Sequence, residues 1–152
     1  MDRPLRDIRV CDVTQNLAGP FCSQILADLG ATVIKVEPPG GDLGRLWGPP
    51  FWGEDSTLFL SANRGKRSIV IDLKQEAGMD VLRRLAESCD VFVQASRPAA
   101  ARRLGVDAAS VRKWREDIVH LSLSAYGQDG PMSDQPGYDP LMQAYAGIIS
   151  VT

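Results

Sequence analysis

Short apolar runs alternate with amphipathic stretches along the whole chain. Runs rich in Ile, Val and Leu predict five strands, at residues 8–14, 32–37, 67–73, 90–95 and 118–127. Helical spacing of apolar residues predicts helices at 21–30 and 76–89, short helices that end at Gly105 and span 107–117, and a helix from 140 onward. This alternation predicts an α/β fold, a mostly parallel sheet with helices on both faces.

The first helix has clear expected boundaries. Pro20 suits its first position and Gly30 its end, while apolar residues between them fall on one face, at Phe21, Ile25, Leu26 and Leu29. With a strand on either side, this helix completes a βαβ unit, which requires parallel strands.

Several loops are expected at the carboxyl ends of these strands, where α/β sheets bind ligands. They are rich in Gly and Pro or basic, and they span Gln15–Pro20, Pro38–Asn63, Ser96–Arg103 and Gln128–Asp139. The weakly periodic stretch Pro38–Asn63 is expected to be one long loop. Such loops suit a phosphate-bearing ligand, although turns alone also favour Gly and Pro.

Composition restricts the class of protein. The chain has 152 residues, 44% of them hydrophobic and 24% charged, with a net charge of −2, as in a soluble globular domain. This charge argues against a nucleic-acid partner. The absence of a membrane-length apolar run and of a signal-peptide core favours a cytoplasmic protein without a membrane partner. The three cysteines, Cys11, Cys22 and Cys89, are widely spaced, so buried reduced thiols are expected and no metal site.

Known nucleotide and hydrolase motifs are missing. The first loop, "NLAGP", lacks GxGxxG, which disfavours an NAD-binding domain, and neither GxxxxGK[ST] nor GxSxG occurs. Glu37 ends the second strand, where it would hold a ribose hydroxyl or pair with a nearby Lys or Arg. His120, the single histidine, is expected to pack within the fifth strand.

Two further stretches carry candidate chemistry. The basic stretch "NRGKRS" contains Arg64, Lys66 and Arg67, which would capture a phosphate or form a solvated turn. In "PGYDP", Tyr138 and Asp139 are acid–base candidates or part of a capped turn, with Asp139 at the N-cap position before Pro140.

These segments, in this order, resemble the N-terminal portion of the family III CoA-transferases, which include the CaiB/BaiF proteins, formyl-CoA transferase and α-methylacyl-CoA racemase. The collinear matching stretches are "LAGPFCSQILADLGATVIKVEPPGGD", "WGPPF", "NRGKRSIVIDLK", "DVFVQASRP", "RRLGV", "LSLSAYGQDGP" and "PGYDPLMQAYAGIISVT". The resemblance implies that residues 1–152 are the Rossmann-like, coenzyme A-binding part of the large domain, with the smaller domain and C-terminal part absent.

The resemblance also implies site residues, with CoA or acyl-CoA as substrate and no metal. Glu37 would face the nucleotide end of CoA, Ile71 and Lys74 would line adenine and its phosphates, and Arg103 would meet the phosphates. Leu17 and Ala18 would lie beside the pantetheine and thioester. Ala95 and Ser96 replace the Asn and aromatic residue of the common "ENFRPG", here "QASRPA". Tyr138 takes the place of a site tyrosine in transferases and of a catalytic histidine in racemases, which favours a transferase.

The activity so implied is that of an acyl-CoA:carboxylate CoA-transferase, which uses an aspartyl anhydride and then an aspartyl thioester. In the family the catalytic Asp lies beyond the segment that ends this chain, so this chain alone is expected to be inactive. An interlocked homodimer, or a partner chain that supplies the missing part, is expected. The alternatives are a truncated, non-catalytic CoA-binding module and an enzyme like α-methylacyl-CoA racemase.

Overall fold

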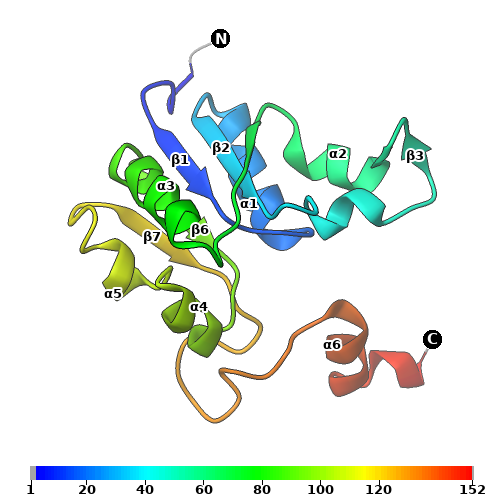
Figure 1. The fold of residues 1–152 in the computed structure, drawn as a ribbon. Helices are drawn as coiled ribbons and strands as arrows, with labels where there is room; N and C mark the ends of the chain where they lie inside the picture. Colours follow the sequence, from blue (N-terminus) through cyan, green and yellow to red (C-terminus); the bar gives the residue numbers. More distant parts are fainter. Residues whose placement is uncertain (1–2, 152) are drawn as a thin grey trace.

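Five parallel strands form the central sheet of the computed structural model, which describes residues 3–151 (Figure 1). They are β1 (Arg9–Asp12), β2 (Thr32–Glu37), β5 (Arg67–Val70), β6 (Val91–Gln94) and β7 (Val119–Ser122), in the spatial order β5-β2-β1-β6-β7. Each lies within a predicted run, and most are shorter than that run. The predicted mostly parallel α/β sheet is therefore confirmed.

The strand order reverses next to β1. Cys11 of β1 is in register with Ile34 of β2 on one side and with Phe92 of β6 on the other. The chain moves outward from β1 through β2 to β5, and then returns to place β6 and β7 on the opposite side. The loops that follow β1 and β6 therefore diverge, and such a reversal point opens a crevice at the carboxyl edge.

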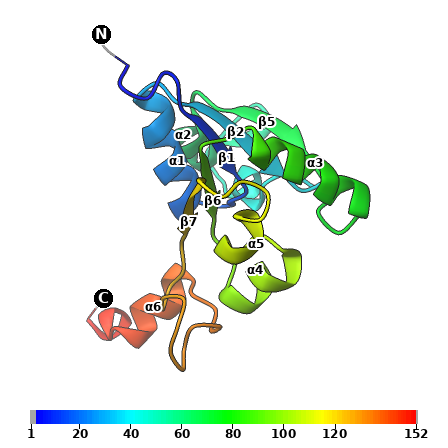
Figure 2. The ribbon, with the colours of Figure 1, turned by 90° about the vertical axis from the view of Figure 1, so that its left-hand side faces the viewer.

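Helices cover both faces of the sheet, as Figure 2 shows. Helices α1 (Ala18–Asp28) and α2 (Thr57–Asn63) lie on one face, while α3 (Glu76–Glu87), α4 (Pro98–Leu104) and α5 (Ala108–Val111) lie on the other. Alternate strand residues feed two apolar clusters because successive side chains point to opposite faces. Val10, Val33 and Val93 pack with Leu26 of α1, whereas Cys11 and Phe92 pack with Leu82 of α3.

Residues 38–63 are not one long loop, and that prediction was wrong. They form the 3-10 helix η1 (Leu43–Leu46), a hairpin of β3 (Phe51–Trp52) and β4 (Asp55–Ser56), and α2. Side-chain caps set these short elements, since Asp42 accepts from Gly44 N at 2.8 Å and Ser56 Oγ from Phe59 N at 3.0 Å. Elements this short produce no readable apolar period.

Two of the predicted helix starts, those of α1 (Ala18–Asp28) and of the helix near residue 140, need correction. Helix α1 begins at Ala18, so Pro20 is its third residue, a position whose N–H has no intrahelical partner. Tyr138, not Asp139, is the N-cap of α6 (Asp139–Tyr145). Asp139 is instead the first helical residue and accepts from Gln143 Nε2 at 2.6 Å, one turn later. The 3-10 helix η2 (Ile148–Ser150) follows α6, and both views place this segment apart from the sheet (Figures 1 and 2).

The cysteines and the histidine largely follow expectation. Cys11 and Cys89 are buried free thiols, but Cys22 is partly exposed, contrary to the prediction, because it lies at the flank of α1. His120 packs as predicted, with its ring stacked on Phe92 at 5.5 Å between centroids. Among residues 3–151, no helix combines the length and the apolar character that crossing a bilayer requires.

Candidate functional site

A groove of about 1150 Å³ opens at the carboxyl edge of the sheet, where the strand order reverses. Its lining comes from all four predicted loops and from the start of the loop after β7. The principal lining residues are Gln15, Asn16, Leu17, Ala18, Gly19, Phe21, Trp47, Ser61, Ala95, Ser96, Arg97, Ala100, Ser124, Ala125, Ser133, Gln135, Gly137, Tyr138 and Asp139. The placement confirms that these loops converge.

The loop after β1 forms one wall and leads directly into α1. Asp12 accepts from the amide of Thr14 at 2.9 Å and also from its hydroxyl, and a Cβ at Gly19 would overlap the Thr14 side chain. Leu17, the N-cap of α1, has an apolar side chain that makes no capping hydrogen bond. The helix therefore presents its first N–H groups, with their partial positive charge, beside the groove.

The loop after β6 forms the opposite wall, and Gln94 fixes it from below. This fully buried side chain accepts from Ser96 N at 2.6 Å through Oε1 and donates to Ser122 Oγ at 2.9 Å through Nε2. Ser122 in turn donates to His120 Nδ1 at 3.3 Å, because His120 Nε2 donates to the Val106 carbonyl at 3.0 Å. Each donor in this chain of hydrogen bonds meets an acceptor. The alternative, flipped amide of Gln94 would place its NH2 group against the Ser96 N–H, so only one orientation fits.

Asp134 ties the third wall to α4. Its Oδ1 accepts from Ala99 N at 2.7 Å, and its carbonyl accepts from Arg97 Nη1 at 3.2 Å. The carboxylate also lies 4.0 Å from Arg102 Nη2. These contacts hold residues 133–139 across the groove from α1.

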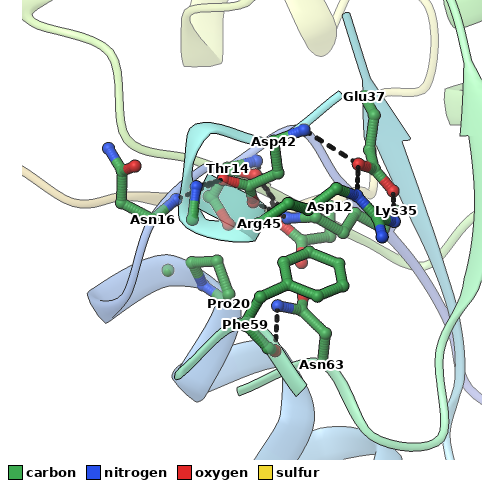
Figure 3. A network of polar contacts seen from close by, with 12 residues as sticks. Asp12, Thr14, Asn16, Pro20, Lys35, Glu37, Asp42, Arg45, Phe59 and Asn63 are labelled. Carbon is green, nitrogen blue, oxygen red and sulfur yellow. Dashed lines mark hydrogen bonds and ion pairs between the residues drawn. The ribbon is translucent and has the colours of Figure 1, made fainter. Parts of the chain in front are cut away.

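Beneath the first wall lies a network of buried charges (Figure 3). Lys35 Nζ pairs with Asp42 Oδ2 at 2.6 Å, and Lys66 Nζ pairs with Asp12 Oδ2 at 3.2 Å, with all four side chains at most 2% exposed. Burial lowers the pKa of Lys66, and the charge of Asp12 works against that shift. The network joins β1, β2 and the loops above them.

Glu37 lies in this network as the partner of an arginine, one of its two predicted alternatives. Its carboxylate accepts from Arg45 Nε and Nη2, the Ser68 hydroxyl and the amide of Asp42. Burial alone would raise the pKa of Glu37, but these hydrogen bonds lower it to about 2. Internal partners thus occupy both carboxylate oxygens, and a contact between Glu37 and CoA stays a prediction.

The basic stretch "NRGKRS" does not form a single cluster. Lys66 is buried on Asp12, with further bonds to the Pro20 carbonyl and to Asn63. Arg64 pairs with Asp28 at the surface, and Arg67 begins β5 at the amino edge of the sheet, away from the groove. Of the two predictions for this stretch, a solvated turn describes Arg64 and Arg67, whereas Lys66 is buried in an ion pair.

The predicted site residues divide into two groups. Leu17, Ala18, Ala95, Ser96 and Tyr138 line the groove together. The remaining four lie outside that lining, at Glu37, Ile71, Lys74 and Arg103.

Of this second group, Ile71 is buried and Lys74 is exposed in the turn after β5, whereas Arg103 is exposed on α4.

Sequence reasoning gave no role to Arg97 or Trp47. Both line the groove. Arg97 directly follows Ser96 in a loop already expected at the site, so its charge and place were a usable signal. Trp47 carried no such signal, because it belongs to a stretch without readable periodicity.

Comparison with known proteins agrees with this architecture. The chain is 44% identical over 151 residues to succinyl-CoA:glutarate CoA-transferase of Mus musculus, which covers 99% of the chain and 35% of that protein. It is 40% identical over 150 residues to acetyl-CoA:oxalate CoA-transferase of Acetobacter aceti, covering 98% of the chain and 38% of that relative.

Among solved structures, a CAIB/BAIF family protein from Brucella suis matches with a TM-score of 0.90 and 37% identity, over 97% of this chain and 40% of that one. The hypothetical protein Rv3272 from Mycobacterium tuberculosis matches with a TM-score of 0.87 and 42% identity, over 96% and 40%. The chain thus spans between 35% and 40% of the length of these proteins. Since the sequence profile of CoA-transferase family III matches residues 5–152, the chain belongs to that family.

Proposed function

We propose that this chain is the coenzyme A-binding part of an acyl-CoA:carboxylate CoA-transferase. The observation that carries the proposal is the groove at the reversal of strand order, lined by Leu17, Ala18, Ser96, Arg97 and Tyr138. Its size exceeds the roughly 300–1,000 Å³ of ordinary ligand pockets, as a ligand as long as CoA requires. The names of the relatives support the same class of reaction.

In this proposal CoA runs along the carboxyl edge of the sheet. The pantetheine arm and thioester lie in the groove against Leu17 and Ala18, with Arg97 at its side. The adenosine end lies toward Lys74 and Arg103, two exposed cations that suit phosphate groups.

The open amino end of α1 suits a thioester carbonyl. In the transfer, a carboxylate attacks that carbonyl, the C–S bond breaks, and the CoA thiolate leaves as a mixed anhydride forms. Ala18 and Gly19 line the groove, and in this proposal their N–H groups stabilise the negative oxygen of the tetrahedral intermediate. The aspartate nucleophile implied by the family resemblance would come from a segment outside residues 1–152.

Two alternative functions fit the same groove. A CoA-binding module without transfer chemistry would share the groove and the affinity. A racemase-like enzyme would use a base where this chain has Tyr138, a residue that lines the groove and is 64% exposed.

Calorimetric titration of the 152-residue chain with CoA tests the binding, with dephospho-CoA and NAD as matched ligands. Binding of CoA that weakens without the 3′-phosphate, and no binding of NAD, is the expected result. A folded chain that binds none of them contradicts the proposed site.

Mass spectrometry of the chain with succinyl-CoA and glutarate then tests transfer. No glutaryl-CoA is expected from this chain alone. Formation of glutaryl-CoA would place the nucleophile within these residues and overturn the expectation that the aspartate lies elsewhere.

A further inference from the structure

Asn16, in the wall of the groove, has a left-handed backbone with a φ of 67°. Non-glycine residues adopt this conformation at a cost of roughly 1 kcal/mol or more, and asparagine often offsets it with a local side-chain hydrogen bond. Here the side-chain Oδ1 is buried and has no hydrogen-bond partner among the described residues. The conformation must therefore be held from outside the residue.

Two buried side chains hold the turn at both ends (Figure 3). Asp42 Oδ1 accepts from Asn16 N at 2.9 Å and from Gly44 N at 2.8 Å. Lys35 Nζ donates to the carbonyl of Thr14 at 2.9 Å and pairs with Asp42 Oδ2 at 2.6 Å. One ion pair thus contacts the amide of Asn16 and the carbonyl two residues earlier.

The burial of this pair argues for a role in geometry. Both side chains are at most 2% exposed, and a buried ion pair gives little net stability compared with apolar residues of similar volume. Its hydrogen bonds to the short segment Thr14–Asn16, by contrast, are directional and end on the backbone. The segment that follows, Leu17 to Gly19, forms the amino end of α1 and lines the groove.

We propose that Lys35 and Asp42 are positioning residues of the ligand site, which hold Asn16 left-handed and thereby aim the first turn of α1 at the bound thioester. This inference rests on the proposed function for the identity of the ligand. Neither residue lines the groove, so both act through the backbone of Thr14 and Asn16.

Two double variants separate positioning from charge. The first, Lys35→Met with Asp42→Asn, removes both charges but keeps an oxygen that accepts from Asn16 N. The second, Lys35→Met with Asp42→Ala, removes the same charges and that acceptor as well. Because neither protein carries an unpaired charge from this pair, the comparison isolates the two hydrogen bonds that the Asp42 side-chain oxygen accepts from Asn16 N and Gly44 N.

The second double variant is expected to bind CoA about tenfold more weakly than the first, and its Asn16 amide is expected to exchange with solvent at least tenfold faster. A destabilised control, Val111→Ala in the core at the end of α5, is expected to keep the CoA affinity of the parent chain. Equal CoA affinity in the two double variants, or an Asn16 amide equally protected in both, would overturn the proposal.

Hydrogen exchange at the Asn16 amide also distinguishes failure of the proposed function from failure of the positioning role. If the parent chain does not bind CoA, the proposed function fails, and loss of protection at Asn16 in the second double variant alone still shows that the side-chain oxygen at position 42 holds the turn. If the parent chain binds CoA but the two double variants agree in CoA affinity or in the protection of the Asn16 amide, only the positioning role fails.

Discussion

The guanidinium of Arg45 donates two hydrogen bonds to the carboxylate of Glu37, from Nε at 2.8 Å to Oε2 and from Nη2 at 2.7 Å to Oε1. Arg45 reaches further to Asp55 at 2.7 Å, and its guanidinium lies 3.9 Å from the centre of the Phe59 ring. One side chain therefore joins β2, the hairpin and α2. This junction explains how residues 38–63 keep a defined shape with little regular structure.

The Glu37 carboxylate is expected to make the protein acid-sensitive. Because its pKa is about 2 in the folded state and ordinarily 4.5, its stabilisation is complete above pH 4.5 and is lost as the pH falls toward 2. Glu37→Gln should flatten the fall in unfolding free energy over that range and cost about 3 kcal/mol at pH 7. Urea unfolding at several pH values measures both effects. The surface variant Asp28→Asn serves as control, and an unchanged slope in Glu37→Gln would refute the assignment.

Charge reversal at Lys74 and Arg103 is expected to weaken CoA binding. Both side chains are exposed, so neither change should disturb the core, and each lost phosphate contact should lower affinity about tenfold. The loss should shrink with dephospho-CoA if either residue meets the 3′-phosphate. Titration in low and high salt measures it, and Arg84→Glu on the exposed side of α3 is the matched control. Unchanged affinity in the Lys74/Arg103 double variant would remove both residues from the site.

Gln94 is expected to act on the second wall of the groove. Gln94→Leu leaves the Ser96 amide and the Ser122 hydroxyl without their partner, which should cost about 1–3 kcal/mol of stability and reduce CoA affinity severalfold. Ser122→Ala removes the bond from Gln94 Nε2 to Ser122 Oγ but keeps the bond to Ser96 N, so this variant should retain more CoA affinity than Gln94→Leu. Thermal melts and titration on both variants provide the test. Equal affinity in Gln94→Leu and the parent chain would mean that the loop keeps its shape without this side chain.

The exposed apolar side chains of helix α6 are expected to make the chain self-associate. None of its residues is buried, and apolar side chains stand exposed along it and beyond, with Leu141 at 44%, Tyr145 at 68% and Val151 at 83%. Apolar patches of this kind favour association. Light scattering and binding of an apolar dye should both fall in Leu141→Ser with Tyr145→Ser. A parent chain that stays monomeric at high concentration and binds no dye would contradict this expectation.

Much of the sheet could be predicted from the sequence because its strands are short and apolar, and because Pro and Gly mark the ends of the helices between them. The convergence of the loops at the carboxyl edge followed from topology alone. The elements between Pro38 and Asn63 were not readable, since they depend on tertiary contacts such as those of Arg45 and on single caps such as Ser56.

The site was readable where the family resemblance implied a residue that also lies in a loop beside the groove. Leu17, Ala18, Ala95, Ser96 and Tyr138 belong to this class. The buried pairing of Lys35 with Asp42 was hidden, because a lysine in a strand and an aspartate in a turn look like ordinary surface residues. Their burial arises from contact between β2 and a loop that follows it, which no local pattern encodes.

Residues 119–151, in contrast to the walls held by Asp42 and Gln94, contain no buried side chain in the described structure. Substitutions in Ser133 to Tyr138, apart from Asp134 with its contacts to α4 and Gly137 with no room for a Cβ, therefore meet little resistance from the folding of the rest of the chain. We expect this wall to vary more among paralogues than the walls held by Asp42 and Gln94, and an alignment of related sequences would measure that difference.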